Sequence, residues 1–167
     1  DDLGLRESSA SPVPDATVGA VIGSLWSAAA AQMYGKEETT ARAPFVRSMA
    51  AWWLRLNPTF RLRDGRKLVE LVGGASWERY VDAIDDGSAY GDAVALVAIS
   101  EVFGVRVVVV TTTTSSDNYV VEVNPNVFKL EKSLILGLVG NYAFCGLRAT
   151  RKSTLFTHRA TAADASE

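Results

Sequence analysis

Few side chains in this sequence could carry nucleophilic chemistry. Ser24 opens an alanine-rich stretch, Cys145 is the single cysteine and His158 the single histidine. A hydroxyl or thiol becomes an effective nucleophile only when a neighbouring group can take its proton. Asn141, which follows Gly140, offers an amide that has no proton titrating near neutral pH. The sequence therefore contains candidate nucleophiles but identifies no base for them.

Each of these residues also has a structural interpretation, which we favour. Ser24 precedes a helical stretch, and serine is a preferred helix N-cap. Asn141 after a glycine is typical of a turn. Cys145 lies in an apolar run and is expected to be buried. His158 lies in a polar tail, where we expect it to be solvated, although spacing alone permits a Cys145–His158 pair.

Composition limits the class of protein. The chain has 167 residues, 48% of them hydrophobic, which suits one compact domain with tails. Its formal net charge of −2 argues against a general phosphate-coating role, although Arg61, Arg63, Arg66 and Lys67 form a local basic cluster. No phosphate-binding glycine loop, Cys/His metal spacing or nucleotide fingerprint is present, so we expect no cofactor and no metal. The apolar runs are too short to span a bilayer.

Hydrophobic spacing predicts helices in the first two-thirds of the chain. Asp92 is expected to cap one of them, and Pro44 is expected in the first turn of another. Trp52 and Trp53 are adjacent and so point to different faces of their helix; an exposed tryptophan there would suggest a partner surface. The predicted helices are Leu25–Tyr34, Pro44–Leu56, Gly65–Leu71, Ser76–Ile84 and Ala93–Phe103.

The last third of the chain reads as strands. The predicted strands are Val105–Thr111, Tyr119–Val123, Ser133–Val139 and Tyr142–Arg148, the last two antiparallel. Helices first and strands later indicate an α+β fold in which helices flank a small mixed sheet. We expect an extended N-terminal arm over residues 1–20, a domain over residues 21–150 and a polar C-terminal arm over residues 151–167.

Three blocks of sequence resemble the ovarian-tumour (OTU) family of deubiquitinating cysteine proteases. The first is similar to the family's nucleophile segment, the second to its Trp-Gly-Asp and Phe-Gly-Val segments, and the third to its strand leading to His-Tyr-Asn/Asp. The blocks are Val21–Gly35; Trp77 and Tyr80 with Tyr90–Asp92 and Val102–Val105; and Leu134–Leu136 with Asn141–Ala143. The resemblance covers residues 20–148 and implies an OTU-like cysteine-protease fold.

The departures from the family pattern fall on its chemistry. Ser24 stands at the position of the nucleophilic cysteine, Asn141 at that of the general-base histidine, and Ala143 at that of the residue that orients the histidine. Val21 replaces the aspartate that opens the nucleophile segment. Because all four polar roles are altered together, the resemblance implies a catalytically inactive member, and an engineered cysteine-to-serine change alone would not explain the pattern.

Four functions are compatible with this sequence. We favour an inactive OTU-like module that contacts proteins in a larger assembly, because the dyad is altered and the two arms are too polar to fold alone. The alternatives are binding of ubiquitin or a ubiquitin-like protein without cleavage, residual hydrolysis by Ser24, and contact with RNA in a ribonucleoprotein through the Arg61–Lys67 cluster. We expect an intracellular location, in the cytoplasm or in an organelle such as the mitochondrion after removal of a presequence.

Overall fold

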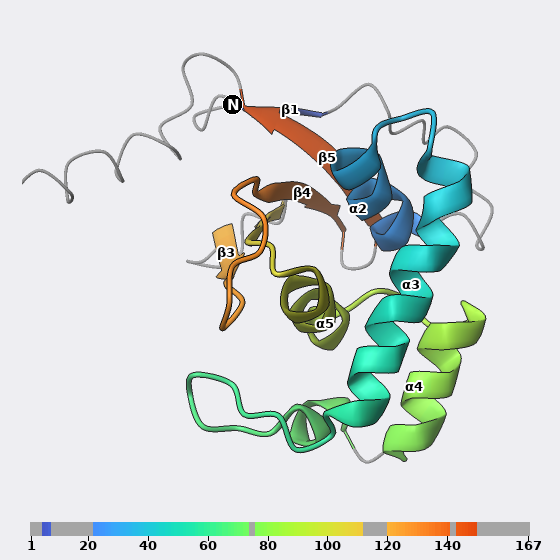
Figure 1. Cartoon of the computed structure of the whole chain (residues 1–167), viewed down its shortest axis with the longest axis vertical. Coiled ribbons are helices and arrows are strands. Elements are labelled where there is room, and N and C mark those ends of the chain that lie inside the picture. Colours follow the sequence, from blue (N-terminus) through green and yellow to red (C-terminus); the bar gives the residue numbers. More distant parts are fainter. Residues whose placement is uncertain (1–4, 8–21, 74–75, 112–119, 141–142, 150–167) are drawn as a thin grey trace, which may run out of the picture.

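The computed structural model describes residues 5–7, 22–73, 76–111, 120–140 and 143–149 (Figure 1). Within these ranges, helices are packed on a mixed β-sheet, which confirms the predicted α+β class. The helices are α2 (Ser24–Tyr34), α3 (Thr39–Leu56), the 3-10 helix η1 (Leu68–Val72), α4 (Trp77–Asp86) and α5 (Ala93–Phe103). The strands are β1 (Leu5–Glu7), β2 (Val107–Thr111), β3 (Val120–Val123), β4 (Leu134–Val139) and β5 (Ala143–Ala149).

Two of the predicted helices need correction. Helix α3 begins at Thr39, so Pro44 lies inside it rather than in its first turn. A proline there removes one bond to the carbonyl four residues earlier, that of Thr40, which is exposed and open to water. The helix predicted over residues 65–71 is instead the 3-10 helix η1, because Gly65 and the residues around it form a hairpin turn.

The sheet has the order β1-β5-β4-β2-β3. Strands β2 and β4 are parallel and the other pairs are antiparallel, which confirms the predicted antiparallel pairing of β4 with β5. The four predicted strands are found within two residues of their expected starts. Strand β1 adds Leu5–Glu7, from the segment expected to be an arm, to the edge of the sheet. No pairing signal in so short a segment could have been read from sequence.

The helices form layers outward from the sheet. Helix α2 packs against β5 and β4 on one side and α3 on the other, while α5 packs against α3 and β3 (Figure 1). Helix α4 packs on α3, farther from the sheet. The fully buried side chains of Leu25, Leu54, Ile99 and Leu136 come from four of these elements and belong to one core. This packing places the N-terminus of α2 against the start of β5.

Near the C-terminal end of α2, the side chain of Gln32 joins the helix to the sheet. The β4–β5 pairing runs from Val139–Ala143 to Leu136–Gly146, and the next pair would be Ile135 with Leu147. There the Gln32 amide takes the place of the strand pairing. Its Nε2 donates to the carbonyls of Ile135 and Leu147, and its Oε1 accepts from the Ile135 N–H at 2.8 Å. Because unpaired backbone groups in a buried sheet are costly, Gln32 stabilises the point where the two strands separate.

Candidate functional site

Ser24 lies where the N-terminus of α2 meets β5. Its Oγ accepts a hydrogen bond from the backbone N–H of Phe144 at 2.9 Å, a contact between residues 120 positions apart. The predicted N-cap role is wrong: Gly23 is the N-cap residue, and no side chain caps the helix. Strand β1 pairs with β5 only as far as Leu147, so a serine hydroxyl rather than a strand carbonyl receives the Phe144 N–H.

The neighbouring strand start carries no titratable side chain in the part of the chain that the structure describes. β5 begins at Ala143, a half-buried residue whose side chain is a methyl group. Asn141 and Val21, the other two altered positions, lie outside the described residues, as does His158. The described ranges contain no histidine. Ser24 therefore lies beside the strand that follows the base position of the resemblance, and its hydroxyl bonds a backbone N–H of that strand.

Gly91, in the second sequence block, lies against the N-terminal turn of α2. This buried residue lies so close to α2 that a Cβ atom on it would be 2.3 Å from Leu25 Cδ2 and 2.6 Å from Leu25 Cβ. Leu25 is the residue after Ser24 and is fully buried. Only a residue without a side chain allows this approach. The second block thus touches the first at the N-terminus of α2, where Phe144, the residue that follows the third block, donates to Ser24.

Asp92 holds the loop after Gly91. As predicted, it caps α5: its Oδ1 accepts from the Ala95 N–H at 2.9 Å. The same oxygen accepts from the Tyr80 hydroxyl at 2.7 Å. Burial, together with the charge of Asp92, raises the pKa of Tyr80 far above its ordinary value, so this hydroxyl stays protonated as a donor. Both oxygen contacts are structural and fix α4 to the start of α5.

Cys145 is buried in β5, as predicted. It lies opposite Gly137 of β4, where an added Cβ atom would be 2.7 Å from the Cys145 sulfur. The sulfur therefore fills the space that a larger residue at position 137 would need. Within the described ranges, no three His, Cys, Asp or Glu side chains lie close enough together to hold a metal ion.

Solved structures with a similar fold identify this arrangement. The chain is similar to the OTU domain of OTUD1, with a TM-score of 0.53 and 14% identity over 76% of this chain and 79% of that one. It is similar to an ovarian-tumour (OTU) domain in complex with ubiquitin, with a TM-score of 0.57 and 16% identity over 86% and 69% of the two chains. It also resembles an OTU deubiquitinase from Wolbachia pipientis wMel bound to ubiquitin, with a TM-score of 0.50 and 14% identity over 87% and 96%.

These similarities establish the fold alone, because the identities are low. No protein-family model matches the sequence, and no curated protein matches it. The class is an α+β protein in which the N-terminus of one helix faces the start of a strand in a mixed sheet. The particular fold is OTU-like, as the three sequence blocks predicted. None of the helices in the described part of the chain is long and apolar enough to cross a membrane.

Proposed function

We propose that this chain is a catalytically inactive OTU-fold module that acts through contacts with other proteins, as a subunit of a larger assembly. The observation that supports the proposal most is the hydrogen bond from the Phe144 N–H to Ser24 Oγ. A serine hydroxyl has two lone pairs, and this bond occupies one of them within the protein. The hydroxyl at the nucleophile position thus contributes to packing between α2 and β5.

The residue types around Ser24 also argue against activation. A serine hydroxyl needs a base that removes its proton. By the resemblance, Asn141 holds the base position and Ala143 the orienting position, and neither side chain can accept and return a proton at neutral pH. In a well-studied catalytic triad, loss of the nucleophile or the base lowers turnover by about six orders of magnitude. Two such losses together leave no useful activity.

Hydrolysis of a ubiquitin C-terminal fluorogenic conjugate tests this proposal. We expect no turnover above buffer for the wild type, and none for Ser24→Cys, because the missing base limits both proteins. A fluorophosphonate probe should likewise fail to label Ser24. Turnover or labelling that disappears in Ser24→Ala would contradict the proposal and favour residual hydrolysis by Ser24.

Binding of ubiquitin without cleavage is the second candidate. It is favoured by one observation: two of the similar solved structures, at TM-scores of 0.57 and 0.50, hold ubiquitin. Titration of isotope-labelled ubiquitin with this chain distinguishes the two candidates. Saturable resonance shifts would support ubiquitin binding, whereas unchanged spectra at high micromolar concentrations would exclude it and leave the interaction role with other partners.

A further inference from the structure

Helix α3 carries an apolar row on its outer face. Phe45, Met49, Trp52 and Leu56 follow the spacing 4-3-4, which places them on one side of a helix. We call these four residues the α3 stripe. Phe45 is 43% exposed, Trp52 52% and Leu56 62%, while Met49 is half-buried. The core face of the same helix is formed by other residues, among them the fully buried Val46, Ala50 and Leu54.

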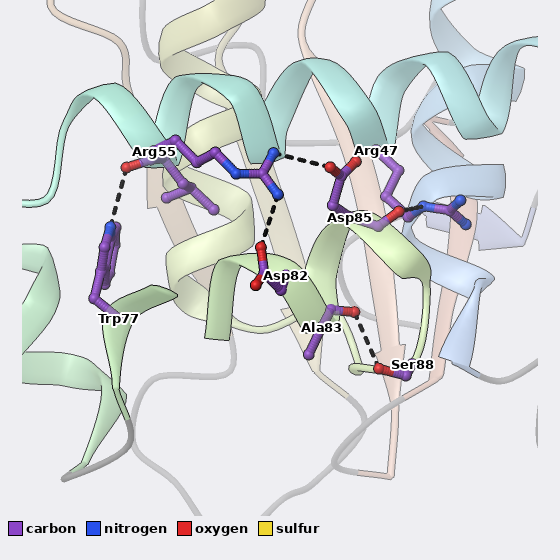
Figure 2. Close-up of polar contacts among 8 residues, drawn as sticks. Arg47, Arg55, Trp77, Asp82, Ala83, Asp85 and Ser88 are labelled. Atoms are coloured by element: carbon purple, nitrogen blue, oxygen red, sulfur yellow. Dashed lines mark hydrogen bonds and ion pairs between the residues drawn. The ribbon is translucent and has the colours of Figure 1, made fainter. Parts of the chain in front are cut away.

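The side of α3 that faces α4 is already occupied. Figure 2 shows Arg55 reaching across to α4, where it bonds Asp82 at 2.9 Å and Asp85 at 2.8 Å. Arg47 donates to the Asp85 carbonyl at 3.0 Å, and Trp77 donates to the Leu54 carbonyl at 3.2 Å (Figure 2). These contacts occupy the side of α3 that faces α4. Within the stripe, Phe45 packs edge-on against Phe103 of α5 with ring centroids 6.4 Å apart, and Trp52 and Leu56 are the most exposed members.

A basic hairpin follows directly after the stripe. Residues 57–67, which we call the basic hairpin, project beyond the C-terminal end of α3 (Figure 1). The Leu62 N–H donates to the Arg66 carbonyl at 2.8 Å, and Arg61 forms an antiparallel bridge with Lys67. At the base of the hairpin, the Phe60 ring packs edge-on against Trp53, with centroids 5.0 Å apart. The hairpin is thus held in place by hydrogen bonds and by the core.

The basic hairpin concentrates positive charge on an acidic protein. It contains four basic residues and one acidic residue, a formal charge of +3, which leaves −5 for the rest of a chain whose net charge is −2. Asp64 pairs internally with Arg66 at 2.6 Å. The exposed Arg63 makes no ion pair or hydrogen bond with any other residue that the structure describes. A surface that is apolar along one helix and cationic at its end is complementary to an acidic amphipathic segment.

We propose that the α3 stripe and the basic hairpin form one docking surface for an acidic amphipathic helix of a partner protein. The partner's apolar face covers the stripe, and carboxylates at one end of the helix pair with the hairpin. This inference rests on the proposed interaction role and assigns that role a surface and a class of partner.

Two other occupants fit the surface less well. The exposed parts of Phe45, Trp52 and Leu56 amount to on the order of 300 Å², taking roughly 200 Å² for each side chain. A stable protein–protein interface buries about 800 Å² on each partner, so the stripe alone is too small for a stripe-to-stripe dimer, whereas a partner helix is proposed to cover the basic hairpin as well. RNA phosphates would pair with the basic side chains of the hairpin, but RNA would place no apolar group over Met49 and Leu56 of the stripe.

Peptide binding to the full chain tests the proposal by fluorescence anisotropy. The probe is a labelled 18-residue helical peptide with leucines spaced 4-3-4 on one face and glutamates at one end and on its flanks. A second peptide has lysine in place of every glutamate. We expect saturable binding of the glutamate peptide that weakens as salt rises, and at least tenfold weaker binding of the lysine peptide.

Variants separate the two parts of the surface. We expect Trp52→Ser and the double variant Arg61→Glu/Arg63→Glu each to weaken binding of the glutamate peptide about tenfold or more. Val121→Ser, which removes an exposed side chain from β3, is the matched control and should leave binding unchanged. Circular dichroism checks that each variant is folded. None of these binding measurements involves Ser24 or hydrolysis. If the glutamate peptide does not bind, the docking-surface proposal is overturned and the inactive-module proposal is unaffected.

Other outcomes would contradict the docking surface. Equal affinity for both peptides, or an equal loss in Val121→Ser, would show that binding is unspecific. Tight binding of a labelled single-stranded RNA that depends on Arg61 and Arg63 but not on Trp52 would assign the hairpin to nucleic acid. A dimer in sedimentation velocity that Trp52→Ser abolishes would assign the stripe to a second copy of the chain.

Discussion

Helix α2 and the outer surface formed by the α3 stripe and the basic hairpin differ in where their side chains make contacts. In the first region, the side chains of Ser24 and Gln32 form hydrogen bonds with backbone atoms of β4 and β5. At the second, the aromatic side chain of Trp52 and the guanidinium of Arg63 face outward. The inner contacts are made within the protein itself, whereas the outer surface is the one proposed to bind a partner.

This difference bears on whether a protein with this fold acts as an enzyme. An enzyme needs reactive groups that are held in place and left free to meet a substrate. Here the hydroxyl of Ser24 accepts a hydrogen bond from a backbone N–H of β5. Substitutions in the inner region should therefore change the free energy of unfolding, and substitutions in the outer region should change binding alone.

The largest effect on stability is expected for Gln32→Leu. This change removes the amide that bonds the carbonyls of Ile135 and Leu147 and the Ile135 N–H. Leaving such groups unpaired in a part-buried setting costs about 3 kcal/mol in total. Urea denaturation measures the loss, with Gln32→Glu as a variant of matched size. A loss below about 1 kcal/mol would show that the β4–β5 separation needs no bridging side chain.

Gly91→Ala should cost somewhat less. The added Cβ atom would lie 2.3 Å from Leu25 Cδ2, so Leu25 or the loop must move. Overpacking of this kind costs about 2 kcal/mol. In a Leu25→Ala background the Cδ2 contact is removed and only the Cβ contact at 2.6 Å remains, so the same substitution should cost less. Equal costs in the two backgrounds would contradict a direct contact between the two sequence blocks at this point.

Ser24→Ala tests the packing role of the hydroxyl. It leaves the Phe144 N–H without its side-chain acceptor and should lower the free energy of unfolding by about 1 kcal/mol. Ser27→Ala, on the exposed side of the same helix, is the matched control and should change stability little. If both variants are as stable as the wild type, the hydrogen bond contributes nothing and Ser24 is free for another role.

Local signals in the sequence were enough for much of the fold. The end of α2, the bounds of α5 and the Asp92 cap follow from helical spacing, Gly35, Gly104 and a carboxylate at the right position. The order of the three blocks predicted the OTU-like fold. Local patterns failed where a distant segment decides the structure.

Ser24 shows the limit most clearly. Its sequence context is that of an N-cap, and only the approach of Phe144 from 120 residues away gives its hydroxyl a different partner. Gln32 is similar: a lone amide in an alanine-rich helix was a signal, but its partners on β4 and β5 are set by tertiary packing. Pro44 misled because helix propensity is weaker than the packing of α3 against α2, α4 and α5.

The smallest effect on stability is expected for Trp52→Ser, and it separates the two regions most directly. Trp52 is 52% exposed on the α3 stripe, so its loss should change the free energy of unfolding by no more than about 0.5 kcal/mol. The adjacent Trp53 is half-buried and packs on Phe60, and Trp53→Ser should cost about 2 kcal/mol. Urea denaturation of the two variants compares neighbouring residues of one type on two faces of one helix. A large loss of unfolding free energy in Trp52→Ser would mean that Trp52 stabilises the fold. The exposure of the α3 stripe would then no longer support a partner-binding role.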